Sequence, residues 1–261
     1  MSRSFVLMRL IAAAICWLLS APVAVAALPV HGVVVKATYP HDTRAYTQGL
    51  FYRDGVLFES TGLEGQSTLR RVRLKDGAVL QSVSISPRMF GEGVVNWGDD
   101  LVSVTWRDQV GFRWDRKTFA LKSSFSYVGE GWGLTQDGKS VIMSDGTAFL
   151  RFLDPRTLRE TRRLRVTAEG RPVANLNELE WVKGEVLANI WQTSLIARIN
   201  PRTGAVTGWI DLSGLPETQR RRDTDSVANG IAYDAAQDRL LVTGKRWPRL
   251  YQISLKPKGS R

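Results

Sequence analysis

The 261-residue sequence predicts an all-β fold, a five-bladed β-propeller, and three observations lead to that prediction. A short pattern recurs five times, each recurrence is followed by strand and turn signals, and one β-rich run stands alone before the first recurrence. No comparable stretch keeps a convincing apolar stripe with the period of an α-helix. The chain is long enough to bury a full-sized core, so we expect one domain over residues 27–261.

The five repeats open on short motifs that are followed by a turn and a second apolar run. Their openings are spaced by about 40 to 50 residues, which is the length of a four-stranded propeller blade. This spacing predicts five blades in one ring. The openings are residues 47–50, 91–94, 131–134, 177–180 and 228–231, and the second apolar runs are residues 56–58, 101–104, 141–143, 186–188 and 240–242.

The second half of each repeat has the signals of a β-hairpin. Residues 75–77 (KDG) and 200–204 (NPRTG) supply turn residues between β-rich runs. The segment 156–166 is helix-like on its own, but its place in the repeat matches the hairpins of the other units. We therefore interpret it as strand and turn.

Ring closure is predicted from the two ends of the repeat region. The last repeat ends after residues 249–255, one strand short, and the unpaired β-rich run 32–39 precedes the first repeat. Pairing this N-terminal strand with the C-terminal blade completes that blade and removes an exposed edge. The connection 213–226 is longer than the others, and we predict that it gates one end of the ring.

The first 26 residues have the pattern of a signal peptide. Arg3 and Arg9 are positive, residues 10–19 are apolar, and the Ala-Val-Ala of residues 24–26 is a small-x-small cleavage site. A retained anchor is the alternative, but the apolar run is shorter than the ~20 residues of a spanning helix. We expect cleavage near Ala26, a periplasmic or secreted protein, and no membrane span in the mature chain.

Composition excludes several kinds of chemistry. Two His and a single Cys are too few for a zinc cluster, a cysteine nucleophile or a disulfide framework. The 36 Lys+Arg against 25 Asp+Glu give a net charge of +11, which attracts polyanions in general. The basic residues are scattered and do not alternate with aromatic ones, so we expect a solvated basic surface and no nucleic-acid partner.

The repeat itself predicts where a site lies, because equivalent positions in a propeller meet around the central channel. The result is an aromatic pocket with a few carboxylates or amides and one ammonium, which is typical of a small-ligand site. One ring of positions holds Gln48, Glu92, Trp132, Glu178 and Asn229, and the other holds Gly62, Trp106, Gly146, Trp191 and Lys245.

These residues also have structural interpretations, which stay open at this point. The tryptophans can pack between blades. Glu92 can be an ion-pair partner of Lys245, since a buried carboxylate generally needs a cation. Gln48, Asn177 and Asn229 can satisfy backbone groups at the blade starts, which is the favoured interpretation for Asn229.

Seven motifs resemble the plant and bacterial glutamine cyclotransferase family over residues 39–255. The resemblance implies a five-bladed propeller, distinct from the zinc-dependent animal-type cyclotransferases, that uses no metal or other cofactor. The motifs are YTQGL at 46–50, ESTGL at 59–63, FGEG at 90–93, NELEW at 177–181, NIW at 189–191, NGIAYD at 229–234 and GKRWP at 244–248.

The family reaction supplies roles for the matched residues. A glutaminyl residue at the N-terminus of a peptide or protein attacks its own side-chain carbonyl with its α-amine, expels ammonia and leaves pyroglutamate. By resemblance Glu92 is the proton shuttle, and we expect the enzyme to be monomeric. Gln48, Asn177 and Lys245 complete the implied catalytic set, and the implied substrate-binding set is Trp106, Trp132, Trp191, Phe90 and Glu178.

Two other functions compete with the enzyme. The first is a periplasmic propeller that binds an anionic or peptide ligand without catalysis, because this fold hosts many functions. The presence of both Glu92 and Lys245 argues against it. The second is a calcium-dependent, lactonase-like propeller, which calls for several carboxylates near the axis and no ammonium beside them.

Overall fold

The computed structural model describes residues 27–219 and 224–257, and the fold of these residues is all β. Within them the only helix is the four-residue α1 (Pro216–Gln219). The predicted all-β class is confirmed. No helix in the described part of the chain is long and apolar enough to cross a membrane. The predicted signal peptide, residues 1–26, lies outside the described residues.

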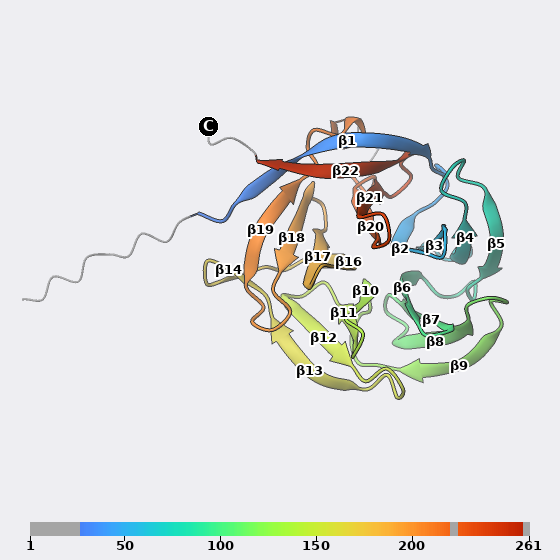
Figure 1. Ribbon diagram of the computed structural model, residues 1–261. Coiled ribbons are helices and arrows are strands. Elements are labelled where there is room, and N and C mark those ends of the chain that lie inside the picture. The colour runs from blue at the N-terminus through green and yellow to red at the C-terminus, as the bar shows by residue number, and fades with distance from the viewer. Residues whose placement is uncertain (1–26, 220–223, 258–261) are drawn as a thin grey trace, which may run out of the picture.

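Three consecutive four-stranded antiparallel sheets follow the first strand, each in the order of the sequence. Figure 1 shows them standing around a common centre, with the first strand of each sheet innermost. The first contains β2 (Thr47–Arg53), β3 (Val56–Thr61), β4 (Thr68–Val72) and β5 (Val79–Ser84); the second, β6 (Gly91–Trp97), β7 (Asp100–Thr105), β8 (Val110–Asp115) and β9 (Leu121–Ser126); the third, β10 (Leu134–Gln136), β11 (Val141–Ser144), β12 (Phe149–Leu153) and β13 (Glu160–Arg165).

The remaining long strands form one eight-stranded sheet, in the order β16-β17-β18-β19-β1-β22-β21-β20. A small hairpin, β14 (Thr167–Ala168) and β15 (Arg171–Pro172), precedes it. The strands of the large sheet are β1 (Val30–Pro40), β16 (Leu176–Val182), β17 (Glu185–Ile190), β18 (Leu195–Ile199), β19 (Val206–Asp211), β20 (Ala228–Asp234), β21 (Arg239–Gly244) and β22 (Arg249–Pro257).

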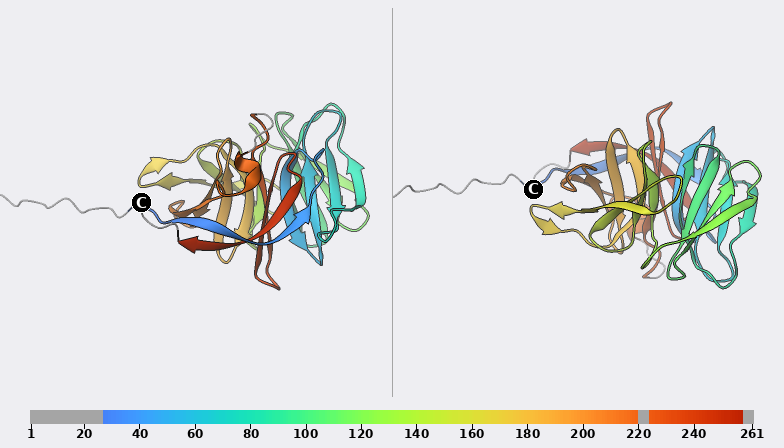
Figure 2. Two further views of the ribbon diagram at one scale, coloured as in Figure 1. Left: turned by 90° about the horizontal axis from the view of Figure 1, so that it is seen from above. Right: turned by 90° about the horizontal axis from the view of Figure 1, so that it is seen from below.

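Strand β1 connects the two halves of this large sheet. It pairs antiparallel with the C-terminal strand β22, with Val33 opposite Leu255, and parallel with β19, with Val30 opposite Trp209. The blue β1 and the red β22 lie side by side in the turned views as well (Figure 2). The first and last strands of the described chain are therefore hydrogen-bonded to each other, and β1 also pairs with β19 at the edge of the β16–β19 unit.

Burial follows the position of a strand within its sheet. The innermost strands β2, β6, β16 and β20 are buried along most of their length, whereas the outer strands β5, β9 and β13 are largely exposed. Strands buried on both faces are apolar and continuous, while outer strands need apolar residues on one face only. Segment 156–166 consists of a turn followed by β13, as predicted.

The repeated glycine of the openings lets neighbouring sheets approach at the centre. A Cβ on Gly93 would lie 2.6 Å from the backbone nitrogen of Leu134, and one on Gly133 would lie 2.2 Å from the backbone oxygen of Asn177. These distances are too short for any side chain, so the motif requires glycine there. The residue just before each glycine is held at the same end of the central channel.

The fourth repeat opens one residue earlier than predicted. Leu176 pairs with Ile190 at the position where Gly91 pairs with Thr105 in the second unit. Asn177 is therefore the equivalent of Glu92, and Glu178 takes the place of the repeated glycine. A one-residue difference in register turns a side chain to the other face of a strand, so this correction matters for the site.

The predicted gating connection, 213–226, lies partly outside the described residues. Its described part packs against the fold: Leu215 is buried, and the Glu217 carboxylate accepts a hydrogen bond from the Tyr251 hydroxyl.

Candidate active site

One pocket of about 350 Å³ collects six of the ten residues in the two predicted rings, together with Asn177 and Phe90. They come from the starts of the innermost strands and the ends of the second strands, as the two rings predict. Of the nine predicted site residues only Glu178 does not line it. The lining residues are Tyr46, Gln48, Leu63, Phe90, Glu92, Trp106, Trp132, Asn177, Trp191, Asp225 and Lys245.

Glu92 is a buried carboxyl at this pocket, with 5% of its surface exposed. It follows Gly91 on β6, and its Oε1 accepts a hydrogen bond of 2.9 Å from Nε2 of Gln48. Burial raises the pKa of Glu92 well above its usual range; the charge of Lys245 opposes this and the charge of Glu130 adds to it. Glu92 therefore keeps a proton more readily than an exposed glutamate.

Gln48 is held in one orientation by Asn229. The Nδ2 of Asn229 donates to the side-chain oxygen of Gln48 over 3.1 Å and to the backbone oxygen of Thr47 over 2.9 Å. Since the oxygen of Gln48 is used in this way, its amide nitrogen faces Glu92. Asn229 does satisfy a backbone group, as its structural interpretation requires, and it also orients a pocket residue.

Lys245 is 4% exposed and follows the last residue of β21. Its Nζ lies 4.6 Å from the centre of the Tyr46 ring, a cation–π distance. Burial lowers the pKa of Lys245, and the charges of Glu92 and Asp225 oppose that shift. The structure describes both Lys245 and Glu92, and no direct ion pair joins them. Their charges nevertheless shift each other's pKa across the pocket.

Aromatic rings form the walls. Trp132 and Trp191 meet edge to face with centroids 5.7 Å apart, and Phe90 packs against Trp106 at 5.6 Å. Phe90 also meets Tyr46 edge to face at 6.0 Å. Such contacts fix ring orientations and keep an apolar lining around the few polar groups. The tryptophans line the pocket, so packing alone does not account for their positions.

Asn177 is buried at the pocket, and its Oδ1 has no hydrogen-bond partner among the described residues. Its backbone oxygen accepts a bond of 2.6 Å from the Ser144 hydroxyl, which anchors this end of β16. A buried amide oxygen without a partner is costly unless something else binds it. The arrangement suits an amide that contacts a ligand.

Glu178 does not reach the pocket, which corrects its predicted place beside the substrate. It is fully buried, with 0% exposed, and its two oxygens accept the backbone N–H groups of Leu50 (3.2 Å) and Ile231 (2.8 Å). These belong to β2 and β20, so Glu178 bridges three innermost strands. Burial and the neighbouring Glu180 raise its pKa well above the usual range.

Four further groups at the site were not predicted from the sequence as site residues. Tyr46, Leu63 and Asp225 line the pocket. Glu130 lies behind the walls, where it accepts hydrogen bonds from the indole N–H groups of Trp106 and Trp132. The repeat gives no signal for Glu130, because the residue belongs to a connection and acts through two tryptophans. Among the described residues, no three His, Cys, Asp or Glu side chains gather to hold a metal ion.

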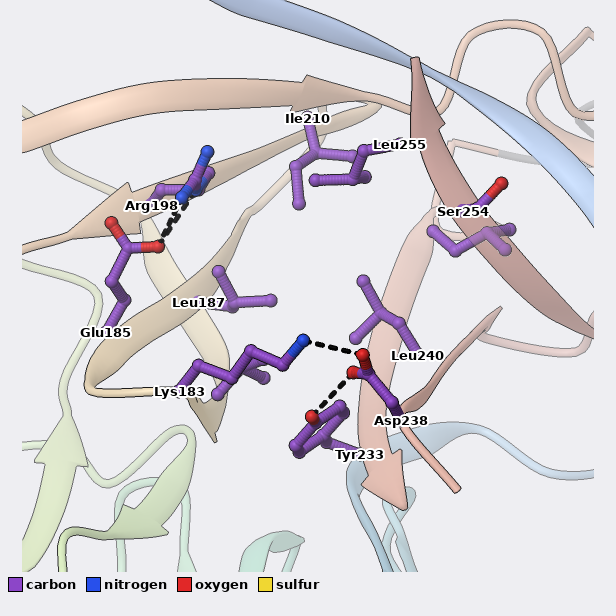
Figure 3. Close-up of a pocket in the computed structure, with 12 residues that line it drawn as sticks. Lys183, Glu185, Leu187, Arg198, Ile210, Tyr233, Asp238, Leu240, Ser254 and Leu255 are labelled. Carbon is purple, nitrogen blue, oxygen red and sulfur yellow. Dashed lines mark hydrogen bonds and ion pairs between the residues drawn. The ribbon is translucent and has the colours of Figure 1, made fainter. Parts of the chain in front are cut away.

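A second hollow, of about 450 Å³, lies elsewhere, between β17–β19 and β20–β22 (Figure 3). Its charged groups pair with one another: Lys183 with Asp238 at 2.7 Å, and Arg198 with Glu185 at 2.6 Å. Its floor is apolar and includes Leu187. This hollow lacks the buried acid and amides of the first pocket, which is therefore the candidate active site.

The fold and the pocket agree with sequence comparison. A profile of the family described as glutamine cyclotransferase matches residues 8–255. The chain belongs to this family. Within it, a glutaminyl-peptide cyclotransferase from Arabidopsis thaliana is 44% identical over 232 residues, which span 87% of this chain and 72% of that protein. The resemblance drawn from the seven motifs is confirmed.

A solved structure from the same family resembles this one closely. The crystal structure of Myxococcus xanthus glutaminyl cyclase matches with a TM-score of 0.84 and 34% sequence identity, covering 89% of this chain and all of that one. Likeness of this extent places the strands of the two family members in a common arrangement.

Proposed function

We propose that this protein is a glutaminyl-peptide cyclotransferase, which converts the N-terminal glutamine of peptides or proteins into pyroglutamate and releases ammonia. Membership of the glutamine cyclotransferase family supports the reaction class. The single structural observation that carries the proposal is Glu92, a buried acid hydrogen-bonded to Gln48 inside an aromatic pocket.

The reaction needs one proton to move from the attacking nitrogen to the leaving nitrogen. The α-amine forms a bond to the side-chain carbonyl carbon, the bond from that carbon to the amide nitrogen breaks, and ammonia leaves. A carboxyl with a raised pKa suits both steps, since it takes the proton from the amine and gives it to the leaving group. We assign this proton transfer to Glu92.

Attack by the amine places a negative charge on the oxygen of the side-chain carbonyl, and this oxyanion needs stabilisation. We assign that role to the polar pocket groups that are not hydrogen-bonded to Glu92. Lys245 brings a positive charge to the pocket, and Asn177 brings an amide there. A fixed donor or charge is worth most in a site from which water is excluded. Gln48 orients Glu92 through its amide nitrogen, so we assign the contacts with substrate carbonyl and amine to Asn177 and Lys245.

The aromatic walls contribute by shape. Trp106, Trp132 and Trp191 line a pocket of about 350 Å³, and we infer that their rings hold a glutamine side chain in a folded conformation. Holding the amine near the carbonyl lowers the activation barrier, because the entropy of bringing the two groups together is lost on binding rather than in the reaction step. Phe90 packs against Trp106 and so supports this part of the pocket wall.

The wider organisation is part of the proposal. We propose that the five four-stranded units are the blades of a five-bladed propeller, that β1 completes the C-terminal blade, and that residues 27–261 act as one monomeric domain. The β1–β22 pairing supports the closure. We also propose that residues 1–26 are removed on export to the periplasm or medium, and that catalysis requires no metal.

The test uses purified mature chain and a peptide that begins with glutamine. Ammonia release and the matching mass loss are measured with and without a chelator, beside the Glu92→Gln variant. We expect chelator-resistant activity that falls at least about a hundredfold in the variant. Activity that survives the substitution overturns the role of Glu92. A folded wild-type protein that cyclises no glutaminyl peptide overturns the function and favours a non-catalytic binding protein.

A further inference from the structure

Glu130 joins two walls of the pocket through a single carboxylate oxygen. Its Oε2 accepts the indole N–H of Trp106 over 2.7 Å and that of Trp132 over 2.9 Å. Trp106 follows β7 in the second unit, while Trp132 precedes β10 in the third. The contact therefore fixes aromatic side chains from two neighbouring sheets relative to each other.

Arg107 holds Glu130 from the other side. Its Nε donates to Oε1 of Glu130 over 3.0 Å, and its guanidinium carbon lies 3.8 Å from the centre of the Trp106 ring. One face of Trp106 is thus covered by a cation that is itself anchored to Glu130. Arginine stacked on an aromatic ring and bonded to a carboxylate holds both partners in register.

We propose that Glu130 is a positioning residue of the cyclotransferase site, which sets the separation of the Trp106 and Trp132 walls and places a fixed negative charge behind them. An indole has one donor and no acceptor. With both donors bound to Glu130, the two walls offer the substrate ring surfaces rather than hydrogen bonds. The inference rests on the proposed function and assigns a role to a residue outside the pocket lining.

The charge of Glu130 also reaches the proton shuttle. Burial opposes ionisation of Glu130, but hydrogen bonds from Trp132, Trp106 and Arg107 lower its pKa, so it is ionised. The charged or titratable groups that act on Glu92 are Lys245, which lowers its pKa, and Glu130, which raises it. Burial raises the pKa of Tyr127 to about 12, and the charge of Glu92 adds to that shift. Glu130 is 34% exposed, so solvent weakens its influence on Glu92.

Two substitutions separate the hydrogen bonds from the charge. Glu130→Ala removes both the acceptor and the charge. Glu130→Gln keeps an oxygen that accepts from the indoles but removes the charge, and its amide nitrogen faces the Arg107 donor. We call Glu130 and its partners Trp106, Trp132 and Arg107 the clamp. Glu64→Gln is the matched control, because Glu64 is an exposed acid next to the pocket residue Leu63 and is not part of the clamp.

The first measurement does not need activity. In ¹H–¹⁵N spectra the indole signals of Trp106 and Trp132, assigned with single Trp→Phe variants, report their hydrogen bonds. We expect both signals to shift in Glu130→Ala and to exchange faster with solvent, while Glu64→Gln leaves them unchanged. Unchanged indole signals in Glu130→Ala overturn the clamp, whether or not the protein is a cyclotransferase.

The second measurement compares steady-state kinetics and pH profiles on a glutaminyl peptide. We expect Glu130→Ala to raise KM about fivefold to tenfold, the effect of losing one or two hydrogen bonds. One limb of the pH profile reports the pKa of the substrate's amine, and we assign the other limb to Glu92. Removing the negative charge of Glu130 lowers the pKa of Glu92, so in Glu130→Gln this second limb moves about half a unit to lower pH. Wild-type KM and an unmoved limb in these variants overturn the positioning role. Wild-type enzyme without activity overturns the proposed function instead, and the indole signals still decide on the clamp.

Discussion

Gln48 donates a hydrogen bond of 2.9 Å to Glu92, and the orientation of that amide is set from behind by Asn229. The three side chains come from β20, β2 and β6, the innermost strands of three different units. Glu92, the proposed proton shuttle, is therefore oriented by side chains of neighbouring units rather than by its own strand. Each part of the chain of bonds can be tested separately.

Replacing Asn229 with alanine should lower kcat/KM about fivefold to tenfold, which is the effect of losing one oriented hydrogen bond. Without Asn229 the oxygen of Gln48 has lost its donor, and the amide is free to turn that oxygen toward Glu92. Steady-state kinetics on a glutaminyl peptide measure the change. The control is the same substitution in a Gln48→Ala background, where it should have little further effect. Two fully additive losses would contradict the relay.

Replacing Lys245 with methionine should move the pH profile in the direction opposite to Glu130→Gln. The positive charge of Lys245 lowers the pKa of Glu92, so its removal raises that pKa and moves the corresponding limb to higher pH. We also expect kcat to fall about a hundredfold or more, because in the proposed mechanism Lys245 supplies the positive charge that stabilises the oxyanion. Lys245→Arg serves as the control that keeps the charge. A limb that moves to lower pH in Lys245→Met is the contradicting result.

The sequence predicted the site as far as the repeat reached. Equivalent positions of the openings and second strands gave six residues of one pocket, because glycines such as Gly93 enforce the same backbone geometry in the units that have them. The family resemblance added Phe90 and Asn177. Glu178 was misplaced since its unit lacks that glycine, and aligning its acid with Glu92 shifted the register by one residue. Glu130 could not be found, because its role depends on where two indole N–H groups point, and a repeat pattern carries no information on that.

Replacing Glu178 with glutamine should reduce stability and leave KM unchanged. The carboxylate accepts two backbone N–H groups, from Leu50 and Ile231, whereas the glutamine side chain has one oxygen and leaves one of them without a partner. A buried donor left in this way costs about 1 to 3 kcal/mol of unfolding free energy. Urea unfolding and KM for a glutaminyl peptide measure the two effects. A large rise in KM at wild-type stability would return Glu178 to the substrate site.

Glu59 is the buried carboxylate that most clearly ties stability to pH. It accepts hydrogen bonds from His41 (3.0 Å), Arg70 (2.5 Å) and the Thr47 hydroxyl (2.7 Å). Burial alone would raise its pKa, but the charges of His41 and Arg70 outweigh burial and lower that pKa to about 2. Thr47 precedes Gln48 on β2, so the cluster also supports the strand that carries the site.

A lowered carboxylate pKa stabilises the folded chain only where the group is ionised. Between the usual value of 4.5 and about 2 the unfolded chain binds more protons, so stability is complete above that window and falls as the pH drops through it. The loss amounts to about 3 kcal/mol. We expect Glu59→Gln to lower the unfolding free energy at neutral pH by about 3 to 5 kcal/mol, since Arg70 then lacks this partner.

Urea unfolding of wild type, Glu59→Gln and the exposed control Glu64→Gln tests this over the acid window. In wild type, burial lowers the pKa of His41, but the charge and hydrogen bond of Glu59 outweigh it and raise that pKa above the ordinary value of 6.5, so His41 is protonated in both folded and unfolded chains there. The wild-type slope in this window therefore belongs to Glu59 and not to His41. Below about pH 4.5 the wild-type curve should fall more steeply than that of Glu59→Gln, and the two should converge near pH 2. Parallel curves would show that the Glu59 carboxylate contributes nothing to acid stability, and the cluster would then only fill space between β2 and the loop that follows β1.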